Sequence, residues 1–186
     1  MLAAKLISTE DELIQVAELS RANLVSNITE ETKQREGYVS WPYPLETLQR
    51  LHTLTPSVIV KEGDLVAGYA LVLTREAVDV YPPLSVAMKY FSKIRYRDRP
   101  LFDFRAYVMG QICVHPDYRG KGAFPLLYQF HRQQFSPLFD MVVTEIAAGN
   151  LRSLKAHQKV GFTIIDTHWD EAGEWHVVAW DWSLIS

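Results

Sequence analysis

An apolar run at residues 106–114 (AYVMGQICV) leads through a glycine-containing loop into an apolar segment of helical length that begins at Phe124. The loop contains Gly120 and Gly122, so the stretch predicts a strand, a glycine loop and a helix in immediate succession. The first N–H groups of a helix have no intrahelical partner, and the helix dipole adds a partial positive charge at the same end. This order therefore predicts a place where an anionic group binds.

The flanking segments predict a mixed sheet in one α+β (α/β mixed) domain that spans residues 1–186. Thr9 to Glu12 has the spacing of a capping box, and a Gly63-Asp64 turn separates the two β-branched runs of a hairpin. Residues 75–105 depart from the pattern and are expected to be an insertion between strands. We expect strands at 5–8, 106–114, 141–147, 162–169 and 174–185, a hairpin at 57–74, and helices after Thr9, within 28–53, near 84–92, at 124–135 and at 151–160.

The composition excludes several classes of protein. With 186 residues, 48% of them hydrophobic and 22% charged, the chain has the make-up of one globular domain. A net charge of -3 gives no electrostatic reason to expect nucleic acid. The single cysteine, Cys113, excludes an intramolecular disulfide, and no histidine has metal-ligand spacing, so no metal is expected. No apolar stretch is long enough for a membrane span, and we expect a cytoplasmic protein without a membrane partner.

The glycine loop does not match the common nucleotide-binding motifs. A P-loop needs a lysine after its second glycine and then Ser or Thr, whereas in GKGAF the lysine, Lys121, stands between the glycines. A dinucleotide fingerprint needs a third glycine, and its position falls on Leu or Pro.

Two motifs instead resemble the GNAT superfamily of acyl-CoA-dependent N-acyltransferases. The first, VHPDYRGKGA, is similar to the family's Val-x-Pro-x-x-Arg-Gly-x-Gly signature from Val114 to Gly122. The second, EIAAGNLRSLKAHQKVGF at residues 145–162, is similar to the family's Asn that is followed seven residues later by a catalytic position and then by Gly-Phe. The two motifs occur in the family's order, with a helix and a strand between them.

The resemblance implies a GNAT-like fold, with a central mixed and mostly antiparallel sheet flanked by helices, and acetyl-CoA as co-substrate. It implies that backbone N–H groups from about Arg119 to Phe124 hold the pyrophosphate of coenzyme A, which suits Gly120 and Gly122 because they lack a Cβ. Phe124 stands where the family usually has Gly or Ala. Gly110 fits either a bulge that opens a gap for the pantetheine arm or a plain strand glycine. The expected cofactor-binding residues are Ile112, Cys113, Val114, Arg119, Gly120, Lys121, Gly122, Ala123, Phe124, Asn150 and Ser153.

Glu145 and His157 are the expected catalytic residues. The resemblance places Glu145 where some amino-group acetyltransferases have a base; the alternative is a carboxylate that only pairs with a nearby cation. His157 stands where most members have a tyrosine acid, and we expect it to protonate the CoA sulfur, directly or through water; the alternative is a helix-surface histidine without a task. The resemblance implies that the N–H of Val114 is the oxyanion donor. Cys113 is expected to be a buried strand residue rather than a nucleophile.

The resemblance predicts direct acetyl transfer from acetyl-CoA to a primary amine of a small molecule or peptide. The acceptor would lie between aromatic-rich segments, EGYVSWPYP at 36–44 and the 75–105 insertion. Arginines of the insertion could meet a carboxylate or phosphate on the acceptor, but interleaved aspartates favour a self-paired loop. These arginines are Arg95, Arg97, Arg99 and Arg105. A non-catalytic acyl-CoA sensor or scaffold is the alternative function, and the aromatic C-terminal strand leaves a homodimer open.

Overall fold

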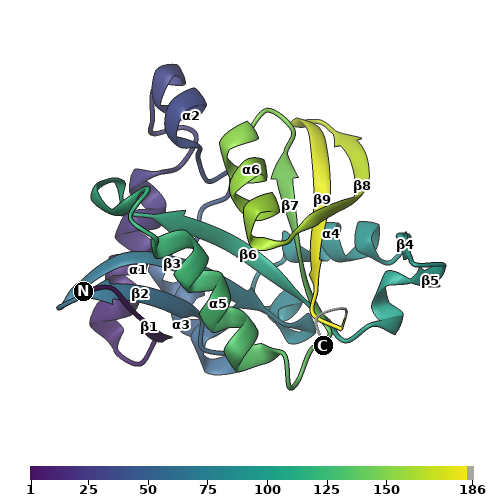
Figure 1. Cartoon of the computed structure of the whole chain (residues 1–186), viewed down its shortest axis with the longest axis horizontal. Coiled ribbons are helices and arrows are strands. Elements are labelled where there is room, and N and C mark those ends of the chain that lie inside the picture. The colour runs from purple at the N-terminus through teal and green to yellow at the C-terminus, as the bar shows by residue number, and fades with distance from the viewer. Residues whose placement is uncertain (184–186) are drawn as a thin grey trace.

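A seven-stranded sheet forms the centre of the molecule (Figure 1). The computed structural model describes residues 1–183, except for the side chains of Gln34 and Arg35. In spatial order the strands are β1 (Ala3–Leu6), β2 (Val58–Glu62), β3 (Leu65–Leu73), β6 (Ala106–Val114), β7 (Met141–Ala147), β9 (Gly173–Asp181) and β8 (Thr163–Asp170). Neighbouring strands pair antiparallel except β6 and β7, which are parallel. The predicted α+β fold with a mixed, mostly antiparallel sheet is therefore confirmed.

Helices cover both faces of this sheet (Figure 1). One face carries α5 (Ala123–Phe135) and α6 (Leu151–Val160), and the opposite face carries α1 (Glu10–Ala22), α3 (Leu45–Leu54) and α4 (Leu84–Phe91). A short helix, α2 (Glu30–Glu36), stands apart from the sheet at the top of the view. The remaining elements are the 3₁₀ turns η1 (Arg75–Asp79), η2 (Leu101–Asp103) and η3 (Pro116–Tyr118) and a small hairpin of β4 (Arg95–Tyr96) and β5 (Arg99–Pro100).

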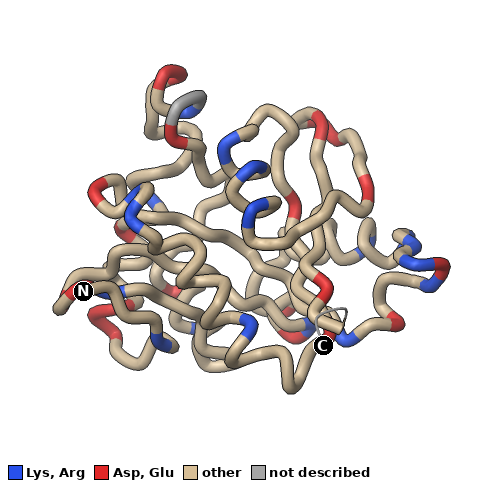
Figure 2. Tube along the Cα trace, in the orientation of Figure 1, with Lys and Arg blue, Asp and Glu red and all other residues tan. Residues whose placement is uncertain are grey.

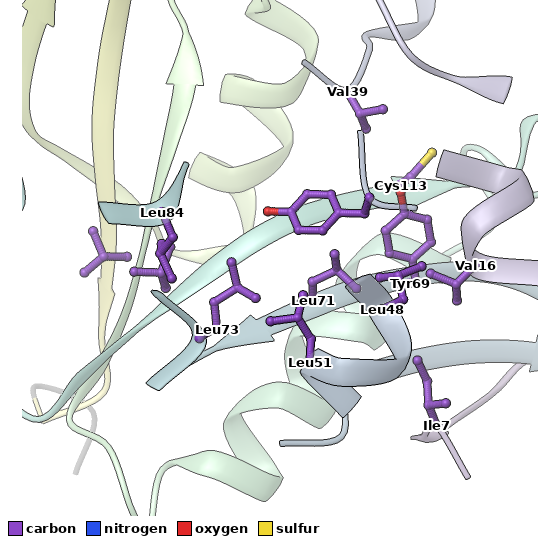
Figure 3. Packing of buried hydrophobic residues seen from close by; sticks show 14 of the residues in the cluster. Ile7, Val16, Val39, Leu48, Leu51, Tyr69, Leu71, Leu73, Leu84 and Cys113 are labelled. Carbon is purple, nitrogen blue, oxygen red and sulfur yellow. The ribbon is translucent and has the colours of Figure 1, made fainter. Parts of the chain in front are cut away.

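A hydrophobic core lies on each side of the sheet. Figure 3 shows the core beneath α1 and α3, where Val16 and Leu51 belong to the same buried cluster as Tyr69 of β3. On the other side, Tyr128 of α5 is fully buried in a cluster with Trp180 of β9. Because β3 is covered on both faces, its sequence is an almost continuous apolar run rather than an alternating one.

Most of the predicted element boundaries agree with the structure. Strands at 106–114 and 141–147 and the helix at 151–160 occur at the expected residues. The strand expected at 5–8 begins and ends two residues earlier. The C-terminal strand ends at Asp181, and residues 184–185 of the strand expected there lie outside the described part of the chain.

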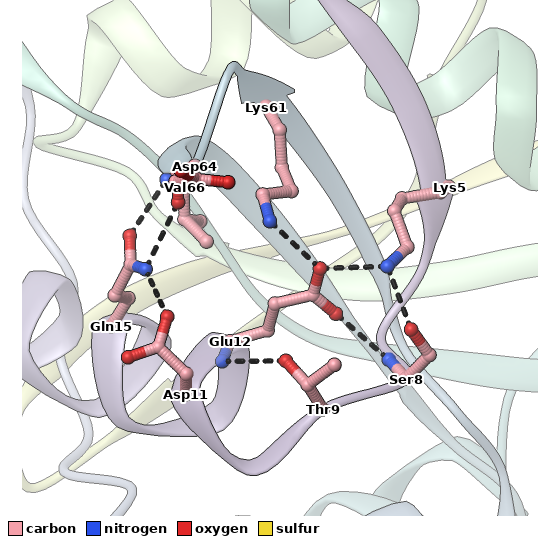
Figure 4. Close-up of polar contacts among 9 residues, drawn as sticks. All are labelled: Lys5, Ser8, Thr9, Asp11, Glu12, Gln15, Lys61, Asp64 and Val66. Carbon is pink, nitrogen blue, oxygen red and sulfur yellow. Dashed lines mark hydrogen bonds and ion pairs between the residues drawn. The ribbon is translucent and has the colours of Figure 1, made fainter.

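The start of α1 is held to β1 and β2 by a buried carboxylate (Figure 4). As the capping-box spacing predicts, Thr9 Oγ1 accepts a hydrogen bond from the Glu12 N–H (3.2 Å). The Glu12 carboxylate accepts from the Ser8 N–H (2.8 Å) rather than from the capping residue, and it also accepts from the ammonium groups of Lys5 (2.7 Å) and Lys61 (3.0 Å). Burial opposes ionisation of Glu12, but these bonds outweigh it and lower the pKa to about 2.

The strands β6 and β7 diverge, and this divergence creates the site described below. They pair only from Ala106 to Val108 of β6, although both strands continue beyond that point. On its other edge β6 holds one more residue than β3 between the pairs Ala70–Ile112 and Val72–Met109, which is a bulge at Gly110. A Cβ at Gly110 would meet the Cδ1 atom of Leu73 at 2.4 Å. Gly110 therefore lies in a bulge of β6 against β3, and close packing requires a glycine there. That this bulge opens a gap for the pantetheine arm stays a prediction.

Candidate active site

Two adjoining cavities open where β6 leaves β7. The larger, about 1350 Å³, is lined by the loop between β6 and α5, by both of the helices α5 and α6, and by residues 36–39; we call it the outer cavity. The smaller, about 350 Å³, lies among β6, β7, α4 and residues 38–43; we call it the inner cavity. Their shared wall residues are Tyr38, Val39, Ile112 and Ser153. A molecule in one cavity can therefore touch a molecule in the other at the free edge of β6.

Four main-chain N–H groups at the start of α5 have no backbone acceptor within the described residues: those of Gly120, Gly122, Ala123 and Phe124. Gly120 and Gly122 have φ angles of +73° and +88°, which a side chain would strain. No side chain caps the helix at Gly122. Gly120, Gly122 and Phe124 line the outer cavity, whereas the Ala123 side chain is buried. The helix start therefore offers unpaired donors at the edge of an open cavity.

Two of the amides expected to bind an anion are used differently. The N–H of Arg119 donates to the carbonyl of Pro116 (3.3 Å), and the N–H of Lys121 donates to the carbonyl of Tyr118 (3.2 Å). These bonds close the turns of the loop, so neither amide is a free donor in this structure. Lys121 also lies outside the cavity lining, with its ammonium 5.8 Å from the Tyr118 ring centroid. Within the expected run from Arg119 to Phe124, the unpaired donors are therefore the four amides above, and their binding of an anion stays a prediction.

The side chain of Arg119 holds the loop in place. Its guanidinium donates to the Val114 carbonyl (3.2 Å), to Glu36 (3.1 Å) and to the Asn23 side-chain oxygen (2.6 Å). These partners belong to β6, to α2 and to the residue that follows α1. Arg119 therefore fixes the mouth of the outer cavity, and its charge is compensated by Glu36.

A basic helix face that the sequence analysis did not single out lines the outer cavity. Arg152, Lys155 and Lys159 lie along α6, and Figure 2 shows their blue segments one above the other on that helix. With Arg119 and Arg132 they make five cations in the lining, against one carboxylate, that of Glu36. The spacing of three and four residues could have revealed this face from the sequence. The outer cavity is therefore suited to an anion.

The N–H of Val114 faces the gap beside β6. In an antiparallel ladder, pairs that exchange hydrogen bonds alternate with pairs that do not. The His115 N–H donates to the Ala67 carbonyl (2.9 Å), so the next pair, Val114 with Gly68, exchanges none. The Val114 N–H consequently points away from β3, to the side where β7 has diverged. It lies where the family resemblance places an oxyanion donor.

The other expected residues of β6 line the same gap. Ile112 lines both cavities, and Cys113 lines the outer one. Burial raises the pKa of the Cys113 thiol to about 12, so hardly any thiolate exists near neutral pH. This agrees with the expectation that Cys113 is a packed strand residue.

Asn150 and Ser153 lie at the junction of the two cavities, at the start of α6. The Asn150 side-chain oxygen accepts from the Ser153 N–H (3.3 Å) and caps the helix, while its amide donates to the Tyr38 carbonyl (3.2 Å). Both ends of the Asn150 side chain are thus bonded inside the protein, although the residue lines the inner cavity. The Ser153 hydroxyl lies 3.4 Å from Nδ1 of His157.

His157 is 1% exposed, and both of its ring nitrogens are engaged. Nδ1 lies 2.8 Å from the Ser153 carbonyl and Nε2 lies 2.7 Å from the Tyr128 hydroxyl. Burial lowers the pKa of His157 to about 4, so the ring is neutral near pH 7. Because the carbonyl can only accept, Nδ1 carries the proton and Nε2 accepts from Tyr128. In this arrangement His157 is not a helix-surface histidine, and Nε2 has no proton to give.

Glu145 forms a pair with His168, a residue that the sequence analysis left without a role. Glu145 Oε1 lies 2.8 Å from His168 Nε2, and the two side chains meet across β9. Burial raises the pKa of Glu145, and the hydrogen bond from His168 opposes that effect. Tyr90 of α4 stacks on the His168 ring at 4.0 Å and donates its hydroxyl proton to Asp166 (2.8 Å). The pair therefore has a fixed orientation in the wall of the inner cavity.

The arginines of the 75–105 insertion lie outside both cavity linings. Arg105 forms two hydrogen bonds to Asp140 (3.1 and 2.6 Å), and Arg97 reaches Asp181 (3.5 Å). Arg95 and Arg99 donate to backbone carbonyls of their own loop. These arginines are thus engaged inside the protein, which disfavours their contact with an acceptor, although their carboxylate partners are Asp140 and Asp181 rather than the interleaved aspartates of the loop.

The described residues give no indication of a metal centre or a membrane segment. Among them, no three His, Cys, Asp or Glu side chains gather as metal ligands would. No helix in the described part of the chain has the length and apolar character needed to cross a bilayer.

Comparisons with solved structures show which proteins share the fold of this chain. No protein-family model matches the sequence, and no curated protein matches it either. The structure is similar to the ribosomal-protein-S18-alanine N-acetyltransferase from Escherichia coli (TM-score 0.64, 12% identity, covering 100% of this chain and 97% of that one). It is also similar to an acetyltransferase of the GNAT family from Bacillus cereus (TM-score 0.61, 15% identity, covering 97% of this chain and 97% of that one). A third similar structure is that of yncA from Salmonella typhimurium with its cofactor acetyl-CoA (TM-score 0.61, 15% identity, covering 97% of this chain and 94% of that one).

Proposed function

We propose that this chain, which has the fold of the GNAT acetyltransferases, is an acetyl-CoA-dependent N-acetyltransferase that acetylates a primary amine. One observation supports the proposal most strongly: the two cavities meet at the free edge of β6. The outer one has basic groups and unpaired amides, and the inner one contains a buried carboxylate–imidazole pair.

The outer cavity fits the phosphates of coenzyme A. The free amides of Gly120, Gly122, Ala123 and Phe124 would hold the diphosphate, because donors at a helix start match an anion in both geometry and charge. The basic face of α6 would attract the remaining negative charge. The gap beside β6, with the Val114 N–H in it, would take the pantetheine arm and the thioester.

Acetyl-CoA, when bound, supplies a thioester whose carbon–sulfur bond breaks as the amine nitrogen bonds to the acetyl carbon, leaving a thiolate. The acceptor amine must first lose a proton, because alkyl ammonium groups have a pKa near 10. In the proposal the Glu145–His168 pair takes that proton. The Val114 N–H would donate to the carbonyl oxygen as negative charge develops on it.

The expected role of His157 as proton donor to the thiolate is not supported by its contacts. A direct transfer from Nε2 would require the Tyr128 hydrogen bond to break and the ring to gain a proton that burial disfavours. The thiolate, whose conjugate thiol has a pKa near 8.5, can instead receive the second proton that the nitrogen loses after attack, through water in the open outer cavity. In the proposal His157 is therefore a positioning residue that holds Tyr128 and the first turn of α6.

Calorimetric titration with acetyl-CoA, followed by an assay for released CoA thiol over a panel of primary amines, tests this function. An acetyltransferase binds acetyl-CoA and releases CoA only when a suitable amine is present. A sensor or scaffold binds acetyl-CoA and releases no CoA with any amine. Absence of binding would reject both functions.

A further inference from the structure

The two cavities differ in charge. The outer cavity has five Lys and Arg side chains in its wall, whereas none of the described residues that line the inner cavity is a Lys or an Arg. The ionisable groups of the inner wall, apart from tyrosines, are Glu145, Asp170, His157 and His168. His157 is neutral near pH 7, and His168 is paired with Glu145. A carboxylate or phosphate in the inner cavity would therefore meet no free cation.

Both carboxylates of the inner wall already have partners. Asp170 Oδ1 accepts from the Trp175 ring N–H (2.8 Å) and from the N–H groups of Ala172 and Gly173 in the turn between β8 and β9. Glu145 is bonded to His168. Oδ2 of Asp170 and Oε2 of Glu145 accept no bond from the described residues, so the wall offers two neighbouring carboxylates near His168. No further carboxylate among the described lining residues is available for the additional charges of a linear polyamine.

The remaining wall of the inner cavity is mostly aromatic and aliphatic. Tyr43 stacks on Tyr81 at 4.5 Å, and Tyr90 stacks on His168 at 4.0 Å. Trp41, which is 49% exposed, also lines the cavity. A volume of about 350 Å³ is near the lower limit for small-molecule pockets. It is suited to one ring, or an aliphatic group of similar bulk, with a short chain.

We infer that the acceptor is a primary amine on a short chain from an aromatic or similarly bulky apolar group, without a carboxylate or phosphate. This inference rests on the proposed function. The apolar group would pack against the tyrosine and tryptophan walls, and the ammonium would point to the Glu145–His168 pair. An acceptor that carries an anion next to its amine would lose water around that anion without gaining a cation in exchange, which is costly in an apolar wall.

Three amines that share the phenylethylamine skeleton test the inference: 2-phenylethylamine, L-phenylalaninamide and L-phenylalanine. CoA release is measured with each at saturating acetyl-CoA, and rates are compared on the concentration of free base. We expect kcat/KM for L-phenylalanine to be about 100-fold or more below that of the amide, since only the carboxylate distinguishes them. A value within about tenfold of the amide, or faster turnover of spermidine than of 2-phenylethylamine, would overturn the inference and leave the proposed function intact.

A matched pair of variants tests whether the lack of a cation in the inner cavity causes the low activity expected with L-phenylalanine. Val86 of α4 is 71% exposed at the edge of the inner cavity, and V86R places a cation there. We expect V86R to raise the ratio of L-phenylalanine to phenylalaninamide activity by about tenfold. S92R adds the same charge to an exposed residue after α4, outside the cavity lining, and should leave the ratio unchanged. Equal ratios in V86R and S92R would contradict this explanation.

Failure of the proposed function would be recognised separately. If acetyl-CoA binds but no amine releases CoA, binding of the three amines to the CoA-saturated protein is measured by calorimetry. If 2-phenylethylamine and the amide bind and L-phenylalanine does not, the result supports the inference about the inner cavity. Absence of binding for all three would overturn it.

Discussion

Glu145 depends chemically on one neighbour, His168, because burial alone would leave its carboxyl group with a raised pKa and little reason to ionise. The histidine contact opposes this rise without cancelling it, so the pKa of Glu145 stays above its usual value. The pair therefore combines a partly desolvated carboxylate with a fixed imidazole, an arrangement suited to a base that works near neutral pH.

The variant E145Q removes the carboxylate and keeps the shape of the side chain. We expect kcat/KM for the acceptor amine to fall by at least about 100-fold, while the dissociation constant of acetyl-CoA measured by calorimetry stays unchanged. E171Q, in the exposed turn between β8 and β9 and outside both cavity linings, is the control and should keep full activity. Equal activity of E145Q and E171Q would remove Glu145 from the reaction.

Among the elements, β6 determines the geometry of the site, since its bulge at Gly110 and its separation from β7 open the gap that both cavities share. Helix α6 contributes the basic face and holds Asn150, Ser153 and His157 at the junction. These two elements bring the outer and inner cavities together.

Gly110→Ala should destabilise the protein because the new Cβ would overlap the Leu73 side chain at 2.4 Å and the Tyr43 hydroxyl at 2.9 Å. Overpacking of this kind costs about 1–3 kcal/mol in the free energy of unfolding, measured by urea denaturation. G149A serves as the control, because a Cβ there would meet no atom within 4 Å. A G110A variant as stable as G149A would show that the bulge does not need a glycine.

Removing two cations from α6 should weaken the binding of acetyl-CoA. We expect the double variant K155A/K159A to raise the dissociation constant by about tenfold at low salt, with a smaller difference at high salt because exposed charges are screened. K89A/K93A removes the same charge from exposed positions in and after α4, outside the outer cavity, and should bind normally. If both double variants bind equally well, the α6 face has no role in binding.

For the whole molecule, two buried histidines link stability to pH. Burial lowers the pKa of His131 to about 3 and that of His157 to about 4, whereas both return to about 6.5 on unfolding. The unfolded chain therefore binds more protons below pH 6.5, and the free energy of unfolding should fall as the pH decreases from 6.5 toward 4. Glu12, with its pKa lowered to about 2, also decreases the free energy of unfolding as the pH falls, but only below about pH 4.5.

The variant H157F isolates one of these groups. Urea denaturation between pH 4.5 and 7 should show a pH slope that is smaller than that of the wild-type protein, with the largest difference, about one proton, near pH 5. An unchanged slope would mean that His157 is not buried in its neutral form.

Local patterns predicted the elements, because each is encoded by adjacent residues: the Thr9 cap, the Gly63-Asp64 turn and the strand at 106–114. The contacts of the site were harder to predict because they join distant segments. The His157–Tyr128 bond spans 29 residues and the Glu145–His168 bond spans 23, and the latter requires the order β7-β9-β8 in the sheet. No sequence pattern around Glu145 or His168 predicts that strand order.

The proposed function requires that the amides at the start of α5 hold the diphosphate of coenzyme A. Titration of ¹⁵N-labelled protein with CoA, followed by amide chemical shifts, tests it without requiring turnover. We expect the largest changes in chemical shift at the amides of Gly120, Gly122, Ala123 and Phe124 as the protein saturates, and smaller changes at those of Arg119 and Lys121. Saturation with CoA while these four amides keep their chemical shifts would show that the diphosphate binds elsewhere.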